Sequence, residues 1–377
     1  MTRFLHTADW QLGMTRHFLE GEAQARFTAA RIDVIGAIGA LAVQEGCSFV
    51  VVGGDVFESN QVERQVVVRA LDAMKATPTV TFYLLPGNHD PIDAASIYRS
   101  STFVDNRPSN VVVLDTSAEV HVAPGLALVG APWPNKRPLT DLVTRAIDDL
   151  PADGTLRVVV GHGITDTLSP DPNDPACIVL ADVEAAIEAG TIHVVALGDR
   201  HSTTQVGGTG RVWYSGAPEP TDYDETDPGN VLIVDLTADG VEVERRRVGS
   251  WRFVRERFDL AGEADCLRVR AFLDALPDKS RTIVKLALVG QLSLAEMAQL
   301  ERTLDVAADL LGALERWERR SELVALPDDE DFEGLGLSGF AADAVQDLRA
   351  LGAGTDAVAL EARDALALLY RLAEVAP

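Results

Sequence analysis

Residues 80–91 form the stretch VTFYLLPGNHDP, the most specific motif in the chain. Its first half is a run of apolar, β-branched and aromatic residues, which predicts a buried strand. The Pro-Gly pair that follows is typical of a tight turn. Directly after the turn come three polar residues, Asn88, His89 and Asp90. Three polar side chains at the end of a buried strand rarely serve packing, so this stretch predicts a functional site at a strand end.

Four further apolar segments end in polar residues in a similar way. Helical periodicity in residues 22–45 and 61–76 separates the first three strands, and this alternation of strand and helix predicts an α/β sheet. Side chains at the carboxyl ends of strands in one open α/β sheet converge on one crevice. In chain order, the five groups are Asp9-x-Gln11, Gly54-Asp55, Gly87-Asn88-His89-Asp90, Gly161-His162 and Gly198-Asp199-x-His201.

The donor atoms of these groups favour a metal site. Carboxylate and amide oxygens mixed with imidazole nitrogens suit Mn²⁺, Fe or Zn. The neighbouring glycines let the backbone turn sharply beside the ions. A single, centrally placed Asp can bridge two cations about 3.5–4 Å apart, which is the spacing of two-metal phosphoester sites. Five groups in this order and spacing are poorly explained as independent turn formers and helix caps.

The chain has 377 residues, which is more than one typical domain. We expect one α/β domain at residues 1–249, because the five polar groups all lie there. Residues 250–325 predict a smaller α+β domain, which ends in a long helix over 293–315. Residues 326–377 predict an acidic linker and two amphipathic C-terminal helices, which form a candidate docking module for a partner.

The formal net charge is −25, from 58 acidic and 33 basic residues. Proteins that bind nucleic acid through their own surface are usually basic, because Lys and Arg contact the phosphates. A nucleic-acid substrate would therefore need a local basic patch, the metals or a partner subunit to supply positive charge. The run Arg245-Arg246-Arg247 is the one concentrated basic patch. The sequence leaves open whether this run follows a DNA backbone or is a solvated strand face.

Two features bear on the cellular location. No stretch of 18 or more apolar residues appears, and the N-terminus runs straight into a strand pattern without an apolar signal region. The three cysteines are sparse and widely spaced, which indicates neither a disulfide framework nor a Cys-x-x-Cys metal site. We therefore expect a cytoplasmic enzyme that does not associate with a membrane.

The five groups resemble the calcineurin-like metallophosphoesterases, whose pattern is Asp-x-His, Gly-Asp, Gly-Asn-His-Asp/Glu, Gly-His and Gly-His-x-His. Within that superfamily the chain is most similar to the SbcD-type DNA repair nucleases. This similarity rests on HTADWQLG at residues 6–13 and on YSGAP at residues 214–218, with Asp224-Glu225 shortly after. It covers roughly residues 1–325. The resemblance implies a two-sheet sandwich flanked by helices, followed by a DNA-facing capping domain.

The resemblance also implies two divalent cations, with Mn²⁺ as the first choice and Mg²⁺, Fe or Zn as alternatives. One cation would be held by Asp9, Gln11, Asp55 and His201. The other would be held by Asp55, Asn88, His162 and Asp199. His89 would be the acid beside the metals that assists the leaving oxygen.

Two residues depart from the family pattern. Gln11 stands where the family has His, and Asp199 stands where it has the first His of Gly-His-x-His. Gln is a weak, neutral ligand, so we expect the first metal to bind less tightly. Asp adds negative charge and shifts the second site toward Mn²⁺ or Mg²⁺. Both residues are able to ligate, so an altered active site is favoured over a dead one.

As a function, the resemblance implies a metal-dependent DNA nuclease in DNA repair or end processing. It would act as a homodimer with an SbcC-like coiled-coil ATPase. Two alternatives stay open. The same core serves phosphodiesterases and phosphatases of small molecules, and the charge of −25 is a weakness of the nuclease hypothesis. Failure to bind two metals at Gln11 and Asp199 would favour a non-catalytic scaffold for partner binding.

Overall fold

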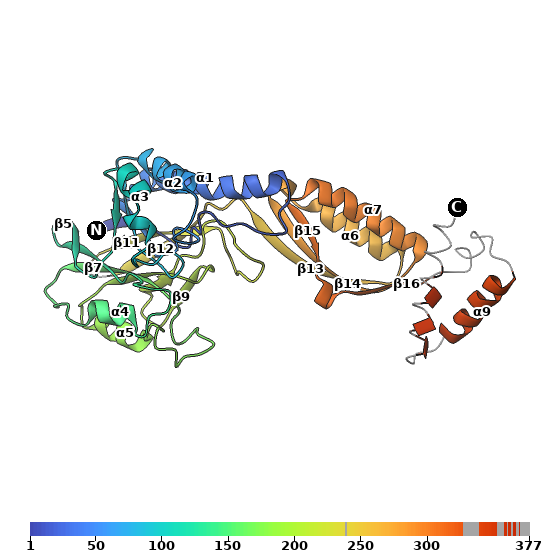
Figure 1. Cartoon of the computed structure of the whole chain (residues 1–377). Coiled ribbons are helices and arrows are strands. Elements are labelled where there is room, and N and C mark those ends of the chain that lie inside the picture. Colours follow the sequence, from blue (N-terminus) through green and yellow to red (C-terminus); the bar gives the residue numbers. More distant parts are fainter. Residues whose placement is uncertain are drawn as a thin grey trace. The chain divides into compact units, whose positions relative to one another are not determined.

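The computed structural model describes residues 1–237, 240–326 and 339–352, with scattered positions between 358 and 369. The chain forms two compact units, Met1–Trp251 and Arg252–Pro377 (Figure 1). They are called unit 1 and unit 2 below. Unit 1 contains all five polar groups found in the sequence.

Two six-stranded sheets form the centre of unit 1. The first sheet has the order β12-β11-β1-β2-β3-β4, and the second has the order β5-β6-β7-β8-β10-β9. The first consists of β1 (Thr2–Thr7), β2 (Phe49–Val52), β3 (Thr81–Leu84), β4 (Val111–Val113), β11 (Asn230–Leu236) and β12 (Val241–Arg247). The second consists of β5 (Val120–Ala123), β6 (Leu126–Gly130), β7 (Leu156–His162), β8 (Val194–Gly198), β9 (Thr204–Val206) and β10 (Val212–Tyr214).

The two sheets face each other, and helices cover their outer faces. Strand β2 illustrates the arrangement, because successive side chains of a strand point to opposite faces. Phe49 and Val51 belong to the core between the sheets, whereas Val50 and Val52 belong to the core beneath the helices of the first sheet. A strand buried on both faces is apolar throughout, which explains the continuous run FVVV. The predicted two-sheet sandwich is confirmed.

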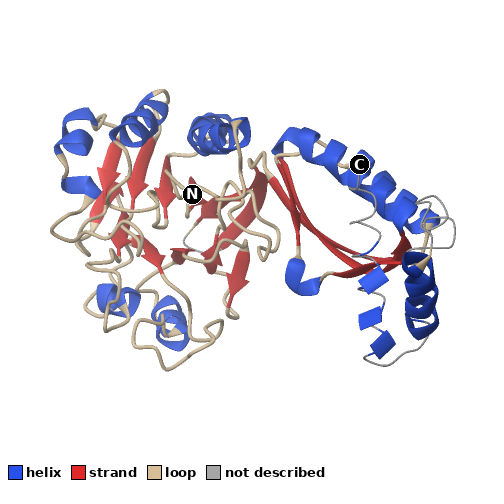
Figure 2. Ribbon diagram, turned by 45° about the vertical axis from the view of Figure 1, so that its right-hand side comes forward, coloured by secondary structure: helices blue, strands red, loops and turns tan. Residues whose placement is uncertain are grey.

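The helices of unit 1 form two groups on the outer sides of the sandwich (Figure 2). Residues of α1, α2 and α3 share one core with the first sheet, and residues of α4 and α5 share another with the second. Their bounds are α1 (Glu22–Gln44), α2 (Arg64–Lys75), α3 (Ser101–Asn106), α4 (Leu142–Ile147) and α5 (Leu180–Glu188). The connections between strands and helices are therefore left at the ends of the sheets, where the polar groups lie.

Helix α1 is the one described helix that is long and apolar enough to cross a membrane by length and composition. Of its most apolar window, 44% is buried inside the protein. Phe27, Ile35 and Ile38 on its inner face are fully buried. The core helix of a globular unit passes the same test, so this feature is weak evidence for a membrane span.

Unit 2 contains one four-stranded sheet with two helices packed on it (Figure 1). Strand β14 pairs in parallel with β13, with β15 through its first half and with β16 through its second half. Helices α6 and α7 share a core with these strands and connect parallel neighbours. The elements are β13 (Arg252–Leu260), α6 (Glu263–Ala275), β14 (Thr282–Ser293), α7 (Leu294–Leu310), β15 (Ala313–Arg316) and β16 (Glu322–Leu326).

One sequence-based prediction in unit 2 is wrong. The long helix expected over 293–315 ends at Leu310, because Leu311 adopts an extended backbone and Gly312 follows. The next four residues form β15, in which Leu314 packs against the sheet core. Helix α7 begins where predicted, at a capping box in which Ser293 and Glu296 bond each other's backbone N–H groups.

The C-terminal region is described in part. Helix α9 spans Phe340–Gly352 and corresponds to the first of the two predicted C-terminal helices. The acidic linker lies almost entirely outside the described residues, and most of the second predicted helix does too.

Candidate metal centre

The polar groups meet at a close approach of the two sheets. Gly53 follows β2 and Gly198 ends β8, and these two glycines lie against one another. A Cβ atom on Gly198 would lie 2.1 Å from the carbonyl oxygen of Gly53. A larger residue at position 198 would therefore push the two sheets apart. This approach brings the carboxyl ends of β1, β2 and β3 together with those of β7 and β8.

At the centre lie Asp9, Asp55 and His162, whose ligand atoms are all within 4.8 Å of one another. All three side chains are buried. His162 Nε2 lies 3.4 Å from Asp55 Oδ1, and His162 Nδ1 lies 2.8 Å from the carbonyl oxygen of Gly53. A carbonyl accepts only from N–H, so Nδ1 carries a proton and Nε2 faces the carboxylates. This is how proteins orient a metal-binding imidazole.

Four residues of the site have strained backbone conformations. Asp9, Gln11, Asp55 and Asp199 have positive φ angles of 54°, 50°, 52° and 92°. Only a small fraction of non-glycine residues adopt such angles. Just two other non-glycine residues share this property in the described part of the chain. Strained residues that cluster in this way are typical of functional sites.

The residue that replaces a family histidine after β1 has an unsatisfied atom. Gln11 Nε2 donates to Asp55 Oδ2 at 2.9 Å, which leaves the amide oxygen facing away from that bond. Gln11 Oε1 is buried and has no hydrogen-bond partner. An unpaired buried acceptor costs free energy unless a donor or cation meets it. A cation at this oxygen would satisfy it, so Gln11 fits a metal-ligating role.

Asp199, the other departure, lies beside both Asp9 and His162. Its backbone N–H donates to the two Asp9 carboxylate oxygens at 2.9 and 3.2 Å. Its own Oδ1 lies 3.6 Å from His162 Nε2. Its side chain is 31% exposed, so it forms the solvent-facing edge of the cluster.

Asn88 contacts His162 on the side opposite Gly53. The amide lies 2.6 Å from His162 Nε2, and its orientation depends on the charge of the ring. With an imidazolium, the amide oxygen accepts from Nε2–H. With a neutral ring, the amide nitrogen donates to Nε2 and also to both Asp55 oxygens at 3.2 Å.

Charge is concentrated in this small volume. Burial raises the pKa of Asp9 to about 7, and burial also raises the pKa of Asp199. Burial opposes protonation of His162, but the carboxylates of Asp55, Asp199 and Asp9 outweigh it and raise its pKa to about 9. Buried carboxylates crowded in this way are stabilised by cations. The donor set therefore fits divalent metal ions.

His201 lies at the edge of the site and is held by other side chains. Its Nδ1 lies 2.7 Å from Thr221 Oγ1 and 3.1 Å from Glu225 Oε1. Burial lowers the pKa of His201, but Glu225 and the nearby Asp9 outweigh this effect and raise it to about 9. A carboxylate behind an imidazole is a common support for metal-binding histidines. Sequence reasoning missed this support, although Glu225 belongs to a motif that it noted.

His89 lies on the open side of Asp55. Its backbone N–H donates to Asp55 Oδ1 at 2.9 Å, and its Nδ1 lies 3.0 Å from the carbonyl oxygen of Glu58. Its Nε2 lies 3.9 Å from Asp55 Oδ2, and the side chain is 40% exposed. The ring is thus fixed from one side, and part of it stays exposed to solvent.

The last residue of the Gly-Asn-His-Asp group has a structural role. Asp90 is fully buried and accepts from the backbone N–H groups of Gly87 and Phe57 at 2.8 and 3.0 Å. The Tyr98 hydroxyl donates to it at 2.6 Å. These bonds hold the turn that carries Asn88 and His89.

The basic run on β12 is partly neutralised by acidic neighbours. Arg245 pairs with Asp227 at 3.2 Å, and Arg246 pairs with Glu45 at 3.2 Å. The solvated-face interpretation of this run therefore gains support over a free phosphate-binding patch.

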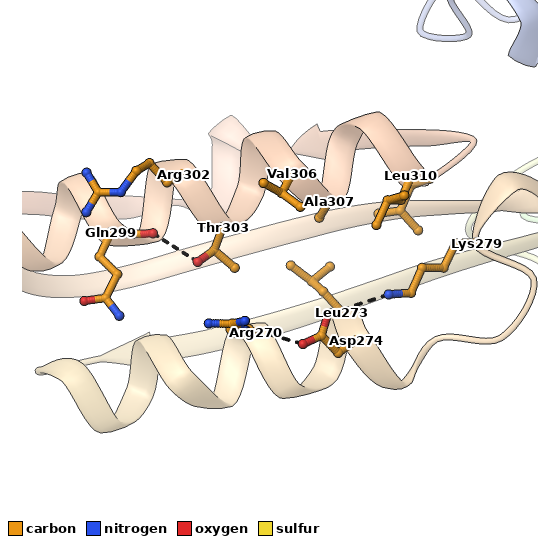
Figure 3. A pocket seen from close by; sticks show the side chains of 11 residues that line it. Arg270, Leu273, Asp274, Lys279, Gln299, Arg302, Thr303, Val306, Ala307 and Leu310 are labelled. Atoms are coloured by element: carbon orange, nitrogen blue, oxygen red, sulfur yellow. Dashed lines mark hydrogen bonds and ion pairs between the residues drawn. The ribbon is translucent and has the colours of Figure 1, made fainter.

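A separate hollow of about 280 Å³ lies between α6 and α7 in unit 2 (Figure 3). Asp274 on its rim pairs with Arg270 at 3.6 Å and with Lys279 at 3.7 Å. Val306 and Leu310 line it with apolar side chains that are about half exposed or more. In the part of the chain that the structure describes, one set of His, Cys, Asp or Glu side chains has its ligand atoms close enough to share a metal ion: Asp9, Asp55 and His162. None of these three residues lines the hollow.

Curated relatives with similar sequences include DNA repair proteins and nuclease subunits. The chain is 27% identical over 275 residues to the DNA double-strand break repair protein Mre11 of Haloferax volcanii, which covers 72% of this chain and 57% of that protein. It is 32% identical over 93 residues to the D subunit of the nuclease SbcCD of Rhodobacter capsulatus, which covers 24% and 22%. The corresponding nuclease subunit of Bacillus subtilis is 26% identical over 155 residues, which covers 39% and 38%.

The chain thus spans less than two thirds of the length of each of these relatives. Among solved structures, a dimetal phosphatase from Danio rerio aligns with a TM-score of 0.41 and 15% identity, over 66% of this chain and 96% of that one. The family model described as calcineurin-like phosphoesterase matches residues 2–223, more than half of the chain. The protein therefore belongs to the calcineurin-like phosphoesterase family.

Proposed function

We propose that this protein is a metal-dependent DNA nuclease that hydrolyses phosphodiester bonds in DNA repair or end processing. The observation that carries the proposal is the buried convergence of Asp9, Asp55 and His162 in a member of the phosphoesterase family. The choice of DNA rests on relatives whose names describe them as DNA double-strand break repair proteins and nuclease subunits.

Two divalent cations would share Asp55 in this proposal. Asp9, Gln11 and His201 complete one ligand set, and Asn88, His162 and Asp199 complete the other. The orphaned oxygen of Gln11 and the crowded carboxylates both support a cationic occupant. Mn²⁺ is our first choice, because oxygen donors outnumber imidazoles at both positions.

When bound, the cations would supply Lewis-acid activation of the phosphate and lower the pKa of the attacking water. The chain's own contribution to bond cleavage is assigned to His89. Its Nδ1 is engaged by the Glu58 carbonyl oxygen, so Nε2 is the atom available to the leaving oxygen. A proton held at Nε2 stabilises that oxygen as the bond breaks.

We further propose that the protein acts in the cytoplasm as a homodimer with a coiled-coil ATPase of the SbcC type. Residues 1–249 would be the catalytic domain, residues 250–325 a capping domain that faces DNA, and residues 326–377 a docking module for the ATPase. The ATPase would also supply positive charge that this chain lacks at −25.

A second candidate function is hydrolysis of a small phosphodiester. The observation that favours it is the pairing of Arg245 and Arg246 with acidic residues, which leaves the basic run poorly suited to a DNA backbone.

The test is an assay of the purified protein with Mn²⁺ on end-labelled single- and double-stranded DNA and on bis-p-nitrophenyl phosphate. The Asp55→Ala variant is the control. DNA cleavage that disappears in the variant supports the nuclease. Turnover of the small diester alone, with and without an SbcC-type partner, supports the second candidate. No turnover of either substrate while two metals bind would refute both.

A further inference from the structure

The segment that supports His201 has several anchors. Residues 219–225 supply both groups that contact His201 Nδ1, the hydroxyl of Thr221 and the carboxylate of Glu225. The Glu225 carboxylate also accepts the Thr221 backbone N–H, 3.0 Å from each oxygen. The position of Thr221 therefore decides where the imidazole of His201 points.

Two arginines hold this segment, Arg31 of α1 and Arg16 of the loop that precedes α1. Arg31 is 1% exposed, and it donates to the carbonyl oxygens of Pro220 at 2.7 Å and Glu219 at 3.4 Å. Arg16 donates to the carbonyl oxygen of Thr221. These bonds fix the backbone of the segment against the N-terminal part of the same unit.

The opposite anchor is the side chain of Glu219, which is 2% exposed. Its Oε1 accepts from the backbone N–H and the hydroxyl of Ser250, at 2.9 and 2.7 Å. Its Oε2 accepts from the backbone N–H of Trp251 at 3.0 Å. A buried carboxylate with three donors forms a strong, directional attachment.

Ser250 and Trp251 are the last two residues of unit 1, and β13 of unit 2 begins at the next residue. Trp251 is fully buried, and its ring lies edge-on against Phe27 at 5.1 Å. The guanidinium of Arg31 lies over the same Phe27 ring at 4.5 Å. One packed cluster behind the metal centre therefore contains Glu219, Arg31 and Trp251.

We propose that Glu219 is a positioning residue, which ties the segment that orients His201 to the residues through which the chain passes into unit 2. Metal binding at His201 then depends on how residues 250–251 are held. This inference rests on the proposed metal site. It assigns no contact between Glu219 and the substrate or the metals.

The consequence of removing the carboxylate follows from its three bonds. A carboxamide at this position has one acceptor oxygen and an NH₂ group that faces another N–H donor. The Glu219→Gln variant therefore cannot keep both the Ser250 and the Trp251 bonds. The backbone at residues 219–221 gains freedom, and the contacts of Thr221 and Glu225 with His201 become less well ordered.

The experiment measures Mn²⁺ affinity by calorimetric titration of the full-length, metal-free protein. Loss of a residue that directly supports a metal ligand costs about 10–100-fold in affinity. Glu225→Gln is the reference for that loss. Because Glu219 acts through one further contact, we expect Glu219→Gln to weaken one of two Mn²⁺ sites by about 3–10-fold. Ser250→Ala, which removes a single bond, should weaken the same site by less.

The matched control is Asp235→Asn. Asp235 also accepts two hydrogen bonds, from Arg3 at 2.8 and 2.6 Å, but Arg3 lies at the opposite end of β1 from the site. This variant should bind Mn²⁺ as the wild type does, even if its unfolding temperature falls.

Hydrogen exchange of the metal-free protein gives a second readout that does not depend on a metal. We expect faster exchange of the backbone amide of Thr221 in Glu219→Gln. Unchanged Mn²⁺ affinity together with unchanged exchange at Thr221 would overturn the inference. If the wild type binds no Mn²⁺, the proposed function fails instead, and the exchange at Thr221 still decides whether Glu219 orders the segment.

Discussion

The Nδ1 atom of His162 is held by the main chain, whereas the Nδ1 atom of His201 is held by side chains. His162 Nδ1 bonds the Gly53 carbonyl oxygen, and the ring is completely buried. His201 Nδ1 contacts Thr221 and Glu225, and its side chain is 26% exposed. Main-chain support within a sheet sandwich is hard to remove by substitution. Support from side chains on a loop is open to adjustment, so we expect the two proposed metal positions to differ in robustness.

Asp55→Ala should have the largest effect, because Asp55 contacts both halves of the site. It lies 3.4 Å from His162 and accepts from Gln11. Loss of a residue that only hydrogen-bonds to a metal ligand costs about 10–100-fold in metal affinity. Loss of a ligand that both cations share should therefore cost more than about 100-fold at both positions. Calorimetry with Mn²⁺ measures this directly. Retention of one tight site would mean that Asp55 is not shared.

His89→Ala should lower turnover by about 10²–10⁴-fold, the usual contribution of a general acid, and leave Mn²⁺ binding intact. His89 approaches Asp55 through its backbone N–H, which the substitution keeps. The measurement is turnover of bis-p-nitrophenyl phosphate at saturating Mn²⁺. Wild-type turnover in this variant would remove the proposed role of His89.

Glu225→Gln removes the side-chain support of His201, whereas Trp133→Phe changes a neighbour of His162 and leaves its main-chain support in place. The first removes the carboxylate behind His201 and should weaken one Mn²⁺ site by about 10–100-fold. The second removes the Trp133 Nε1 bond to the His162 carbonyl oxygen, 2.7 Å long, but leaves the bond between the ring and Gly53. We expect nearly unchanged Mn²⁺ affinity in Trp133→Phe. Equal losses in both variants would contradict the distinction between main-chain and side-chain support.

Gln11→His should strengthen the weaker position several-fold, because imidazole is a better ligand than a neutral amide for Mn²⁺ or Zn²⁺. Gln11 is also strained at a φ of 50°, an angle that His tolerates better than most residues. The gain should appear in titrations with Zn²⁺ more than with Mn²⁺. A weaker site in this variant would show that the Gln11 amide is required for other reasons.

The metal-free protein should lose stability as pH rises. His162 and His201 have pKa values raised to about 9, so their stabilising charge is present below about pH 6.5 and is lost as pH rises through 9. Asp9, with a pKa raised to about 7, adds a loss between about pH 4 and 7. Thermal unfolding in EDTA at pH 6 and pH 9 should differ by a few degrees, about 2–4 °C for each kcal/mol. Saturating Mn²⁺ should reduce the difference.

Long-range pairings explain where sequence reasoning was incomplete. The run Arg245-Arg246-Arg247 suggested a basic patch, but Arg246 meets Glu45, which lies about two hundred positions earlier in the chain. The boundary between α7 and β15 was misplaced, because a short apolar segment matches a helix and a strand equally well. Its strand identity depends on pairing with β14.

The family, the α/β sandwich and the strand ends that carry polar residues could all be predicted from the amino-acid sequence. Buried strands are apolar throughout, so they can be recognised in the sequence together with the glycines and polar groups at their ends. The assignment of individual metal ligands remains a prediction. The groups that hold each imidazole became apparent only in the folded chain, because a backbone carbonyl oxygen such as that of Gly53 has no signature in the sequence. The partners of Glu219 lie 31 and 32 residues further along the chain and meet it only in the packed fold, so its proposed role could not be read from the sequence.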